Sequence, residues 1–165
     1  SRNGIGASRP LSRPAAPVYH PPYSSQRRMD GSFERDFRAL GDVYAFTRRF
    51  AETHRFDESL EYSIHLVVEE LFTNMVKYNI GGGREISIRM ELGSGSLRIE
   101  LVDEDVDPWD PNEAPAVRTD RPIEERKPGG LGLYLVRSIV DDLRYEYANR
   151  RMKVTAIKNL ESRNV

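Results

Sequence analysis

Residues 57–78 of the 165-residue chain read DESLEYSIHLVVEELFTNMVKY, and their apolar positions recur at helical spacing. Asp57 is a suitable N-cap with Glu61 soon after it, and the run ends before the three glycines at 81–83. Because the apolar stripe is wide, the stretch predicts a buried helix of about six turns. The members of the stripe are Leu60, Ile64, Val67, Val68, Leu71, Phe72, Met75 and Val76.

Short strands and two further helices are predicted around this helix. Residues 85–92 and 97–103 alternate apolar and polar and are joined by Gly93-Ser94-Gly95-Ser96, which indicates an antiparallel hairpin. The full order predicts an α+β two-layer sandwich, with a mostly antiparallel sheet and the helices on one face. The other predicted strands cover Ser32 to Leu40, Leu143 to Ala148 and Met152 to Leu160, the last two joined at Asn149-Arg150, and the other helices cover Val43 to Arg55 and Gly129 to Asp141.

The first 29 residues differ in composition from the rest of the chain. They contain five of the ten prolines and five arginines but no acidic residue. This composition predicts a disordered or extended leader over 1–29 and a folded domain over 30–165. Met29 could be a natural start, in which case the residues before it are not native or are a linker; a basic interaction tail is the alternative.

Composition excludes several classes of protein. The chain has no cysteine, so a disulfide framework, a thiolate metal site and a cysteine nucleophile are excluded. No apolar run approaches the roughly 18 residues of a membrane span, and no secretory signal is visible. Beyond residue 29 there are 20 basic and 26 acidic residues, which disfavours nucleic acid as a partner. We expect protein or small-molecule partners, with the cytoplasm as the default location.

The predicted helix over 57–78 carries a polar edge. Glu70 and Asn74 are four residues apart and Lys77 follows three later, so all three emerge on one edge of the helix. A carboxylate beside a carboxamide suits Mg²⁺, the carboxylate can act as a base, and Lys77 can contact phosphate. The alternative is an ordinary solvated edge with a common Glu–Lys pairing.

Two more groups of residues could bind a ligand. Asp103 ends a strand whose Leu97, Ile99 and Leu101 face the helices, so its carboxylate points the same way and can accept a hydrogen bond from an exocyclic amine such as that of adenine. Gly129, Gly130 and Gly132 open a helix whose first N–H groups can hold an anion such as a triphosphate. The alternatives are a strand-end acid turning into a loop and a tight helix start for packing.

Residues 104–127 carry four prolines and twelve charged side chains without periodicity. A connection of this length predicts a mobile lid over a ligand site.

Three runs together resemble the N, G1 and G2 boxes of the GHKL ATPases, whose ATP-binding domain is called the Bergerat fold. The resemblance covers about residues 32–160 and is greatest to the anti-sigma factor serine kinases of the RsbW and SpoIIAB type. The runs are Glu70-Leu71-Phe72-Thr73-Asn74, then Asp103 to Pro111 (DEDVDPWDP), then Gly129-Gly130-Leu131-Gly132-Leu133.

The resemblance implies an ATP-dependent serine/threonine protein kinase that phosphorylates an anti-anti-sigma (STAS) protein, sequesters a sigma factor and forms a homodimer. It also implies that Glu70 is the general base, that Asn74 coordinates Mg²⁺ and that Asp103 holds adenine. The nucleotide-binding residues would be Asn74, Lys77, Asp103, Asp105, Gly129, Gly130, Leu131 and Gly132, with Arg118, Arg121, Arg126 or Lys127 of the lid close to the γ-phosphate.

The G1 box departs from the pattern of that family, because Asp105 stands where a glycine is usual. An alternative register, anchored on Pro108-Trp109-Asp110-Pro111, moves the adenine carboxylate to Glu104 or Asp105. Two other functions therefore stay open: a non-catalytic module that binds a sigma factor or its antagonist, and the ATPase domain of a histidine kinase.

Overall fold

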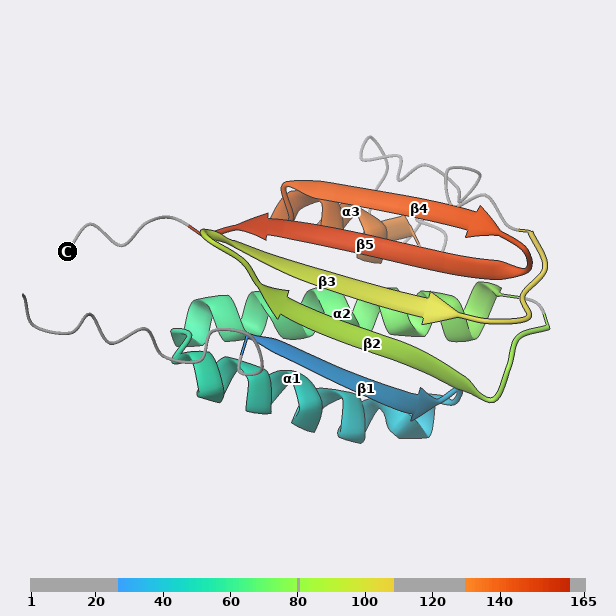
Figure 1. Ribbon diagram of the computed structural model, residues 1–165, viewed down its shortest axis with the longest axis horizontal. Coiled ribbons are helices and arrows are strands. Elements are labelled where there is room, and N and C mark those ends of the chain that lie inside the picture. Colours follow the sequence, from blue (N-terminus) through green and yellow to red (C-terminus); the bar gives the residue numbers. More distant parts are fainter. Residues whose placement is uncertain (1–26, 80, 109–129, 161–165) are drawn as a thin grey trace, which may run out of the picture.

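The computed structural model describes residues 27–79, 81–108 and 130–160. In this part of the chain a five-stranded sheet is covered on one face by three α-helices, so the predicted α+β sandwich is confirmed (Figure 1). In chain order the elements are β1 (Arg28–Glu34), the 3-10 helix η1 (Phe37–Ala39), α1 (Leu40–His54), α2 (Glu58–Tyr78), β2 (Glu85–Leu92), β3 (Ser96–Asp103), α3 (Gly130–Ile139), β4 (Asp142–Ala148) and β5 (Arg151–Asn159).

The sheet has the order β1-β2-β3-β5-β4, and all neighbouring strands are antiparallel. Both predicted hairpins are confirmed, since β2 pairs with β3 and β4 pairs with β5. The second hairpin turns at Asn149 and Arg150, whose φ angles of 53° and 61° are typical of a tight two-residue turn. This strand order places β3 at the centre of the sheet, and Asp103 is the last residue of β3.

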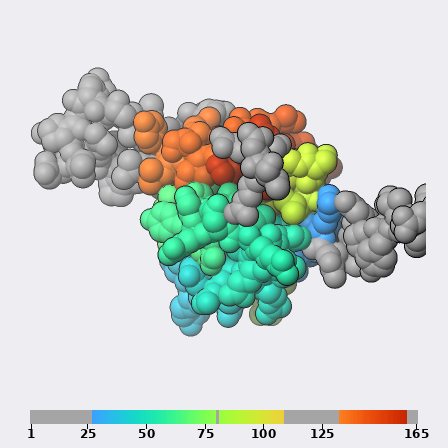
Figure 2. Space-filling model, turned by 90° about the vertical axis from the view of Figure 1, so that its left-hand side faces the viewer, coloured from blue at the N-terminus to red at the C-terminus, as the bar shows by residue number. Residues whose placement is uncertain are grey.

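Helix α2 is the centre of the helical layer. It begins at the predicted N-cap, where the Asp57 carboxylate accepts a hydrogen bond from the Leu60 N–H at 2.9 Å. It packs against α1 and α3. Figure 2, viewed from the end at which α1 passes into α2, shows the orange segment of α3 and β4 above the teal and green segment of α1 and α2. Helix α2 therefore lies between two other helices.

The core lies between the sheet and the helices. Alternate residues of β3 face it, and Leu97, Ile99 and Leu101 are all buried there beside Phe72 of α2. Asp103 continues the same alternation and is fully buried as well. The strand parity expected from the sequence thus brings a carboxylate to the edge of an apolar core.

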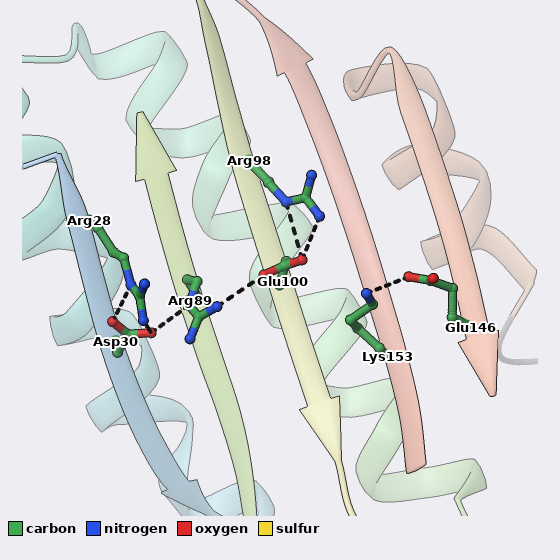
Figure 3. A network of polar contacts seen from close by, with 7 residues as sticks. All are labelled: Arg28, Asp30, Arg89, Arg98, Glu100, Glu146 and Lys153. Carbon is green, nitrogen blue, oxygen red and sulfur yellow. Dashed lines mark hydrogen bonds and ion pairs between the residues drawn. The ribbon is translucent and has the colours of Figure 1, made fainter. Parts of the chain in front are cut away.

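The opposite face of the sheet is solvated and bears crossing ion pairs (Figure 3). Most of these side chains are about half exposed, whereas Glu100 is 12% exposed, and surface pairs of this kind each contribute about 0–1 kcal/mol to stability. This face of the sheet is therefore polar, whereas the buried Asp103 carboxylate lies on the helical side. The pairs drawn are Arg28–Asp30, Arg89–Asp30 and Arg98–Glu100, each at 2.7 Å, Arg89–Glu100 at 3.7 Å and Lys153–Glu146 at 2.7 Å.

The strand predicted over Ser32 to Leu40 is wrong beyond Glu34. The Asp36 carboxylate accepts a hydrogen bond from the Arg38 N–H at 2.8 Å, which caps η1 and turns the chain away from the sheet. Helix α1 then starts at Leu40, three residues before the predicted Val43.

Two other boundaries differ from the prediction. Helix α3 ends at Ile139 rather than Asp141, because the Asp141 N–H already bonds to the Ile157 carbonyl of β5 at 2.8 Å. Strand β1 begins at Arg28, two residues before the predicted start of the folded domain. Among the described residues, the helices are too short or too polar to traverse a bilayer.

We expect Leu101→Ala to lower the free energy of unfolding by about 2–5 kcal/mol, because the substitution leaves a cavity beneath α2 at a side chain that is 0% exposed. Urea denaturation measures the change. Tyr62→Ala is the control, since Tyr62 is 67% exposed and its loss is expected to cost about 0.5 kcal/mol or less. Equal effects of the two substitutions would contradict the described core.

Candidate functional site

The carboxylate of Glu70 lies against the first turn of α3. Gly132 is in that turn, and a Cβ atom added there would overlap the carboxylate, so the two groups approach as closely as glycine permits. The first N–H groups of a helix have no partner within the helix and favour negative charge. The structure therefore brings together two of the predicted groups, the edge of α2 and the glycine-rich start of α3.

Asn74 lies one helical turn beyond Glu70 and is only 7% exposed. Its Nδ2 has no hydrogen-bond partner among the described residues. An unpaired buried amide costs about 1–3 kcal/mol, so this position favours a ligand that supplies oxygen atoms.

Lys77 is exposed at the end of the same helix edge. Its Nζ lies 5.9 Å from the centroid of the Phe37 ring of η1. Its positive charge also acts on the Glu70 carboxylate, whose pKa it tends to lower. Lys77 thus influences the site through its charge while its ammonium group packs over η1.

Asp103 is held by two partners inside the protein. Its Oδ2 accepts a hydrogen bond from Asn79 Nδ2 at 2.6 Å, and its Oδ1 forms an ion pair with Arg35. Asp103 is completely buried, and the Arg35 side chain is 12% exposed. Neither partner is among the predicted site residues. Together they contact both oxygens of the carboxylate that was expected to face a ligand.

Arg35 also binds the end of α2 and the glycine segment after it. Its guanidinium donates to the carbonyl oxygens of Gly83 at 3.2 Å, Asn79 at 3.1 Å and Met75 at 3.4 Å. Gly82 lies directly beside it, with a φ of 79° and with no room for a Cβ atom, which would overlap the guanidinium. Glycine is therefore required at 82 both for the left-handed backbone and for the close approach of Arg35.

Burial changes the acidity of both carboxyl groups. For Asp103, burial raises the pKa, while the Asn79 hydrogen bond and the positive charge of Arg35 act to lower it. For Glu70, burial raises the pKa, Glu69 adds to the increase, and Lys77 opposes it. A carboxylate with a raised pKa is a better proton acceptor near neutral pH than an ordinary one, which suits Glu70 to act as a base.

The three acids at the end of β3 have different surroundings. Asp103 is buried, whereas Glu104 and Asp105 are exposed, and Glu104 pairs with Arg151 at 3.0 Å. Asp105 has a φ of 57°, a left-handed conformation that glycine adopts readily, and its carbonyl accepts the Gly82 N–H at 2.8 Å. The usual glycine position is thus occupied by an acid that keeps the backbone conformation of a glycine.

Several predicted residues lie outside the described part of the chain. Gly129 is among them, together with most of the predicted lid. Gly130 and Leu131 are described only as the backbone that begins α3. The lid cations Arg118, Arg121, Arg126 and Lys127 also lie outside the described residues.

Arg35 and Asn79 were not predicted from the sequence as site residues. A signal for Arg35 was present, because it lies two residues after Phe33 and shares the inward parity of β1. A charged residue at an inward position requires a buried partner. Asn79 gave a weaker signal, since it follows α2 as an ordinary helix-ending residue.

Residues 33–158 match the model of the histidine kinase-like ATPase domain. The chain belongs to this family. GHKL-type members of this family bind ATP, generally with Mg²⁺.

Solved structures align with the chain at low sequence identity, and no curated protein matches it. The RsbU and RsbW domains of Rv1364c from Mycobacterium tuberculosis align with a TM-score of 0.58 at 16% identity, over 81% of this chain and 32% of that one. The chain therefore spans about a third of that structure's length. The histidine kinase domain of a blue-light activated kinase from Erythrobacter litoralis aligns with a TM-score of 0.46 at 15% identity, over 74% of this chain and 60% of that one. The histidine kinase AdeS of Acinetobacter baumannii aligns with a TM-score of 0.45 at 15% identity, over 81% of this chain and 68% of that one.

We expect Arg35→Met to lower the free energy of unfolding by about 3–5 kcal/mol at neutral pH, because it leaves the buried Asp103 carboxylate without its cation. In the variant, the pKa of Asp103 in the folded state lies above its unfolded value near 3.8, so the folded protein retains a proton that the unfolded chain releases. Stability is then greatest below that value and falls as the pH rises through the folded pKa.

Urea denaturation of wild type and Arg35→Met at acid and neutral pH measures this dependence. We expect the substitution to lower the free energy of unfolding less in acid than at neutral pH. Arg38→Met is the matched control, because Arg38 is 84% exposed and pairs with Asp36 at the surface. A loss in Arg35→Met no greater than in the control, or one that does not change with pH, would contradict the buried ion pair.

Proposed function

We propose that the protein is an ATP-dependent serine/threonine protein kinase and anti-sigma factor of a partner-switching cascade, and that it phosphorylates an anti-anti-sigma protein of the STAS class. The observation that carries this proposal is the contact of Glu70 with the first turn of α3, one helical turn from the unpartnered amide of Asn74. The likeness to a structure that contains an RsbW domain supports the choice within the family.

The residues at this edge fit a magnesium nucleotide. The N–H groups at the start of α3 are suited to phosphate oxygens, and an oxygen-bearing ligand would satisfy the buried amide of Asn74. Among the described residues no three His, Cys, Asp or Glu side chains group to hold a metal ion. Mg²⁺ would therefore be held by the Asn74 carboxamide together with phosphate oxygens, and when bound it neutralises charge on the phosphates.

The chemical step is transfer of the γ-phosphoryl group to a serine or threonine hydroxyl. The hydroxyl oxygen forms a bond to the γ-phosphorus, the bond to the β–γ bridging oxygen breaks, and ADP leaves. The hydroxyl proton passes to the Glu70 carboxylate, whose raised pKa favours its capture. Asn74 and the first turn of α3 position the phosphates, which is most of what phosphoryl transfer requires of a protein.

A second function is favoured by one specific observation. Asp103, which would hold the adenine amine, is already bonded to Arg35 and Asn79. A protein with its base-binding end closed in this way could bind a sigma factor or an anti-anti-sigma protein without transferring phosphate. Binding of the partner that is independent of nucleotide, with no label transferred from ATP, would select this docking module over the kinase.

We expect Glu70→Gln to lower the rate of phosphate transfer to the partner by about 10²- to 10⁴-fold, because the amide cannot accept the hydroxyl proton. Labelled ATP, Mg²⁺ and a STAS-domain protein provide the assay, with ATP affinity measured separately by calorimetry. Affinity should change little, since Glu70 is assigned to proton transfer.

Glu69→Gln is the matched control, because Glu69 is the exposed neighbour on the same helix.

The wild-type rate should fall as the pH drops through the raised pKa of Glu70, since the base must be unprotonated. Equal rates for wild type and Glu70→Gln would refute the assigned base, and the absence of any transfer would refute the kinase.

A further inference from the structure

Arg35 gives Asp103 the same kind of hydrogen-bond donor that a base would give. A guanidinium and an exocyclic amine both offer N–H groups to a carboxylate, and a charged donor binds it more strongly. In the structure the Arg35 guanidinium forms an ion pair with Oδ1, and Asn79 donates a hydrogen bond to Oδ2. Both oxygens of the Asp103 carboxylate thus already face side chains of the protein itself.

Access to the carboxylate is closed as well. Asp103 is 0% exposed, so a ligand can reach its oxygens only when a neighbouring side chain moves. Gly82 packs directly on the Arg35 guanidinium, and the Gly82 and Gly83 N–H groups bond to the carbonyls of Asp105 and Glu104 at 2.8 Å. Arg35 is therefore enclosed between the segment after α2 and the end of β3.

The two partners of Asp103 are anchored differently. The Asn79 bond is short at 2.6 Å, and Asn79 is itself the residue that ends α2, with its N–H bonded to the Met75 carbonyl. Apart from Asp103, Arg35 binds three carbonyl oxygens at 3.1–3.4 Å, and water can replace it at such acceptors. Its side chain is also partly exposed, which gives it a route to solvent.

We propose that Arg35 determines the nucleotide affinity of this site by competing with the base for Asp103. Base binding and the Arg35–Asp103 ion pair exclude each other. The competent fraction of the protein, meaning the fraction able to bind nucleotide, is therefore the fraction in which the pair is broken. This inference rests on the proposed function, which assigns Asp103 to the base. It adds an affinity-determining residue that directly follows β1, outside the three segments around which the site is built.

A supporting role for Arg35 would change nucleotide affinity in the opposite direction. If Arg35 supports Asp103 from behind and orients it toward the base, removal of Arg35 weakens nucleotide binding. If Arg35 competes, removal strengthens binding, because the apparent dissociation constant is the intrinsic one divided by the competent fraction. A minor state populated at about 0.1–10% corresponds to tightening by about 10- to 1,000-fold.

The test is the dissociation constant for Mg²⁺–ATP, measured by calorimetry on the full chain for wild type, Arg35→Met and Arg38→Met. We expect Arg35→Met to bind at least about tenfold more tightly than wild type and Arg38→Met to match wild type. Affinity in Arg35→Met that is equal to or weaker than in wild type overturns the inference while leaving the nucleotide site intact.

The outcome is separable from that of the proposed function. Tighter binding in Arg35→Met supports the inference even if no phosphate reaches a partner protein, a result that would count against the kinase alone. If none of the three proteins binds an adenine nucleotide, the inference and the nucleotide site fall together.

A measurement on the unsubstituted protein covers the case in which Arg35→Met does not fold. The Arg35 Nε–H, which bonds to the Gly83 carbonyl, gives an NMR signal that can be assigned by its loss in Arg35→Lys. Saturating Mg²⁺–ATP is expected to shift this signal as Arg35 leaves Asp103. A signal that stays unchanged while other resonances report bound nucleotide overturns the inference.

Discussion

The ion pair between Arg35 and Asp103 is the interaction on which the arrangement of the site depends. It joins the end of β1 to the end of β3 across β2, and the same guanidinium binds carbonyl oxygens at the end of α2 and in the glycine segment after it. A buried carboxylate without a cation is costly, so these segments are held in one arrangement as long as the pair persists. Gly82 is part of the same constraint, because a side chain there would occupy the space of the guanidinium.

The candidate site consequently has two unlike ends. At one end, Glu70 meets the first turn of α3 and Asn74 presents a buried amide without a partner, which is a suitable place for phosphate oxygens. At the other end, Asp103 is bonded to Arg35 and Asn79 and cannot be reached from solvent. Membership of the histidine kinase-like ATPase family fits the first end directly. Under the proposed competition, binding of the base at the second end requires the Arg35 side chain to move.

Patterns of apolar residues were sufficient to predict most of the fold. The stripe along α2 and the alternation in β3 each depend on one periodic face packing against the core, and that face is visible in a single sequence. The strand over Ser32 to Leu40 was mispredicted because Asp36 caps a short helix, and local hydrogen bonding of this kind competes with a weak alternation. The approach of Glu70 to the start of α3 followed from motifs, whereas the position of Arg35 depends on contacts between residues 40 to 68 positions apart, which no local pattern specifies.

A crystal structure of the protein with Mg²⁺ and a non-hydrolysable ATP analogue tests this account most directly. The account predicts phosphates at the first turn of α3 beside Asn74, the base amine bonded to Asp103, and the Arg35 guanidinium displaced from that carboxylate. A nucleotide bound at the first turn of α3 with Arg35 still paired to Asp103 would contradict the competition between the side chain and the base. The absence of bound nucleotide at saturating analogue would contradict the nucleotide site itself.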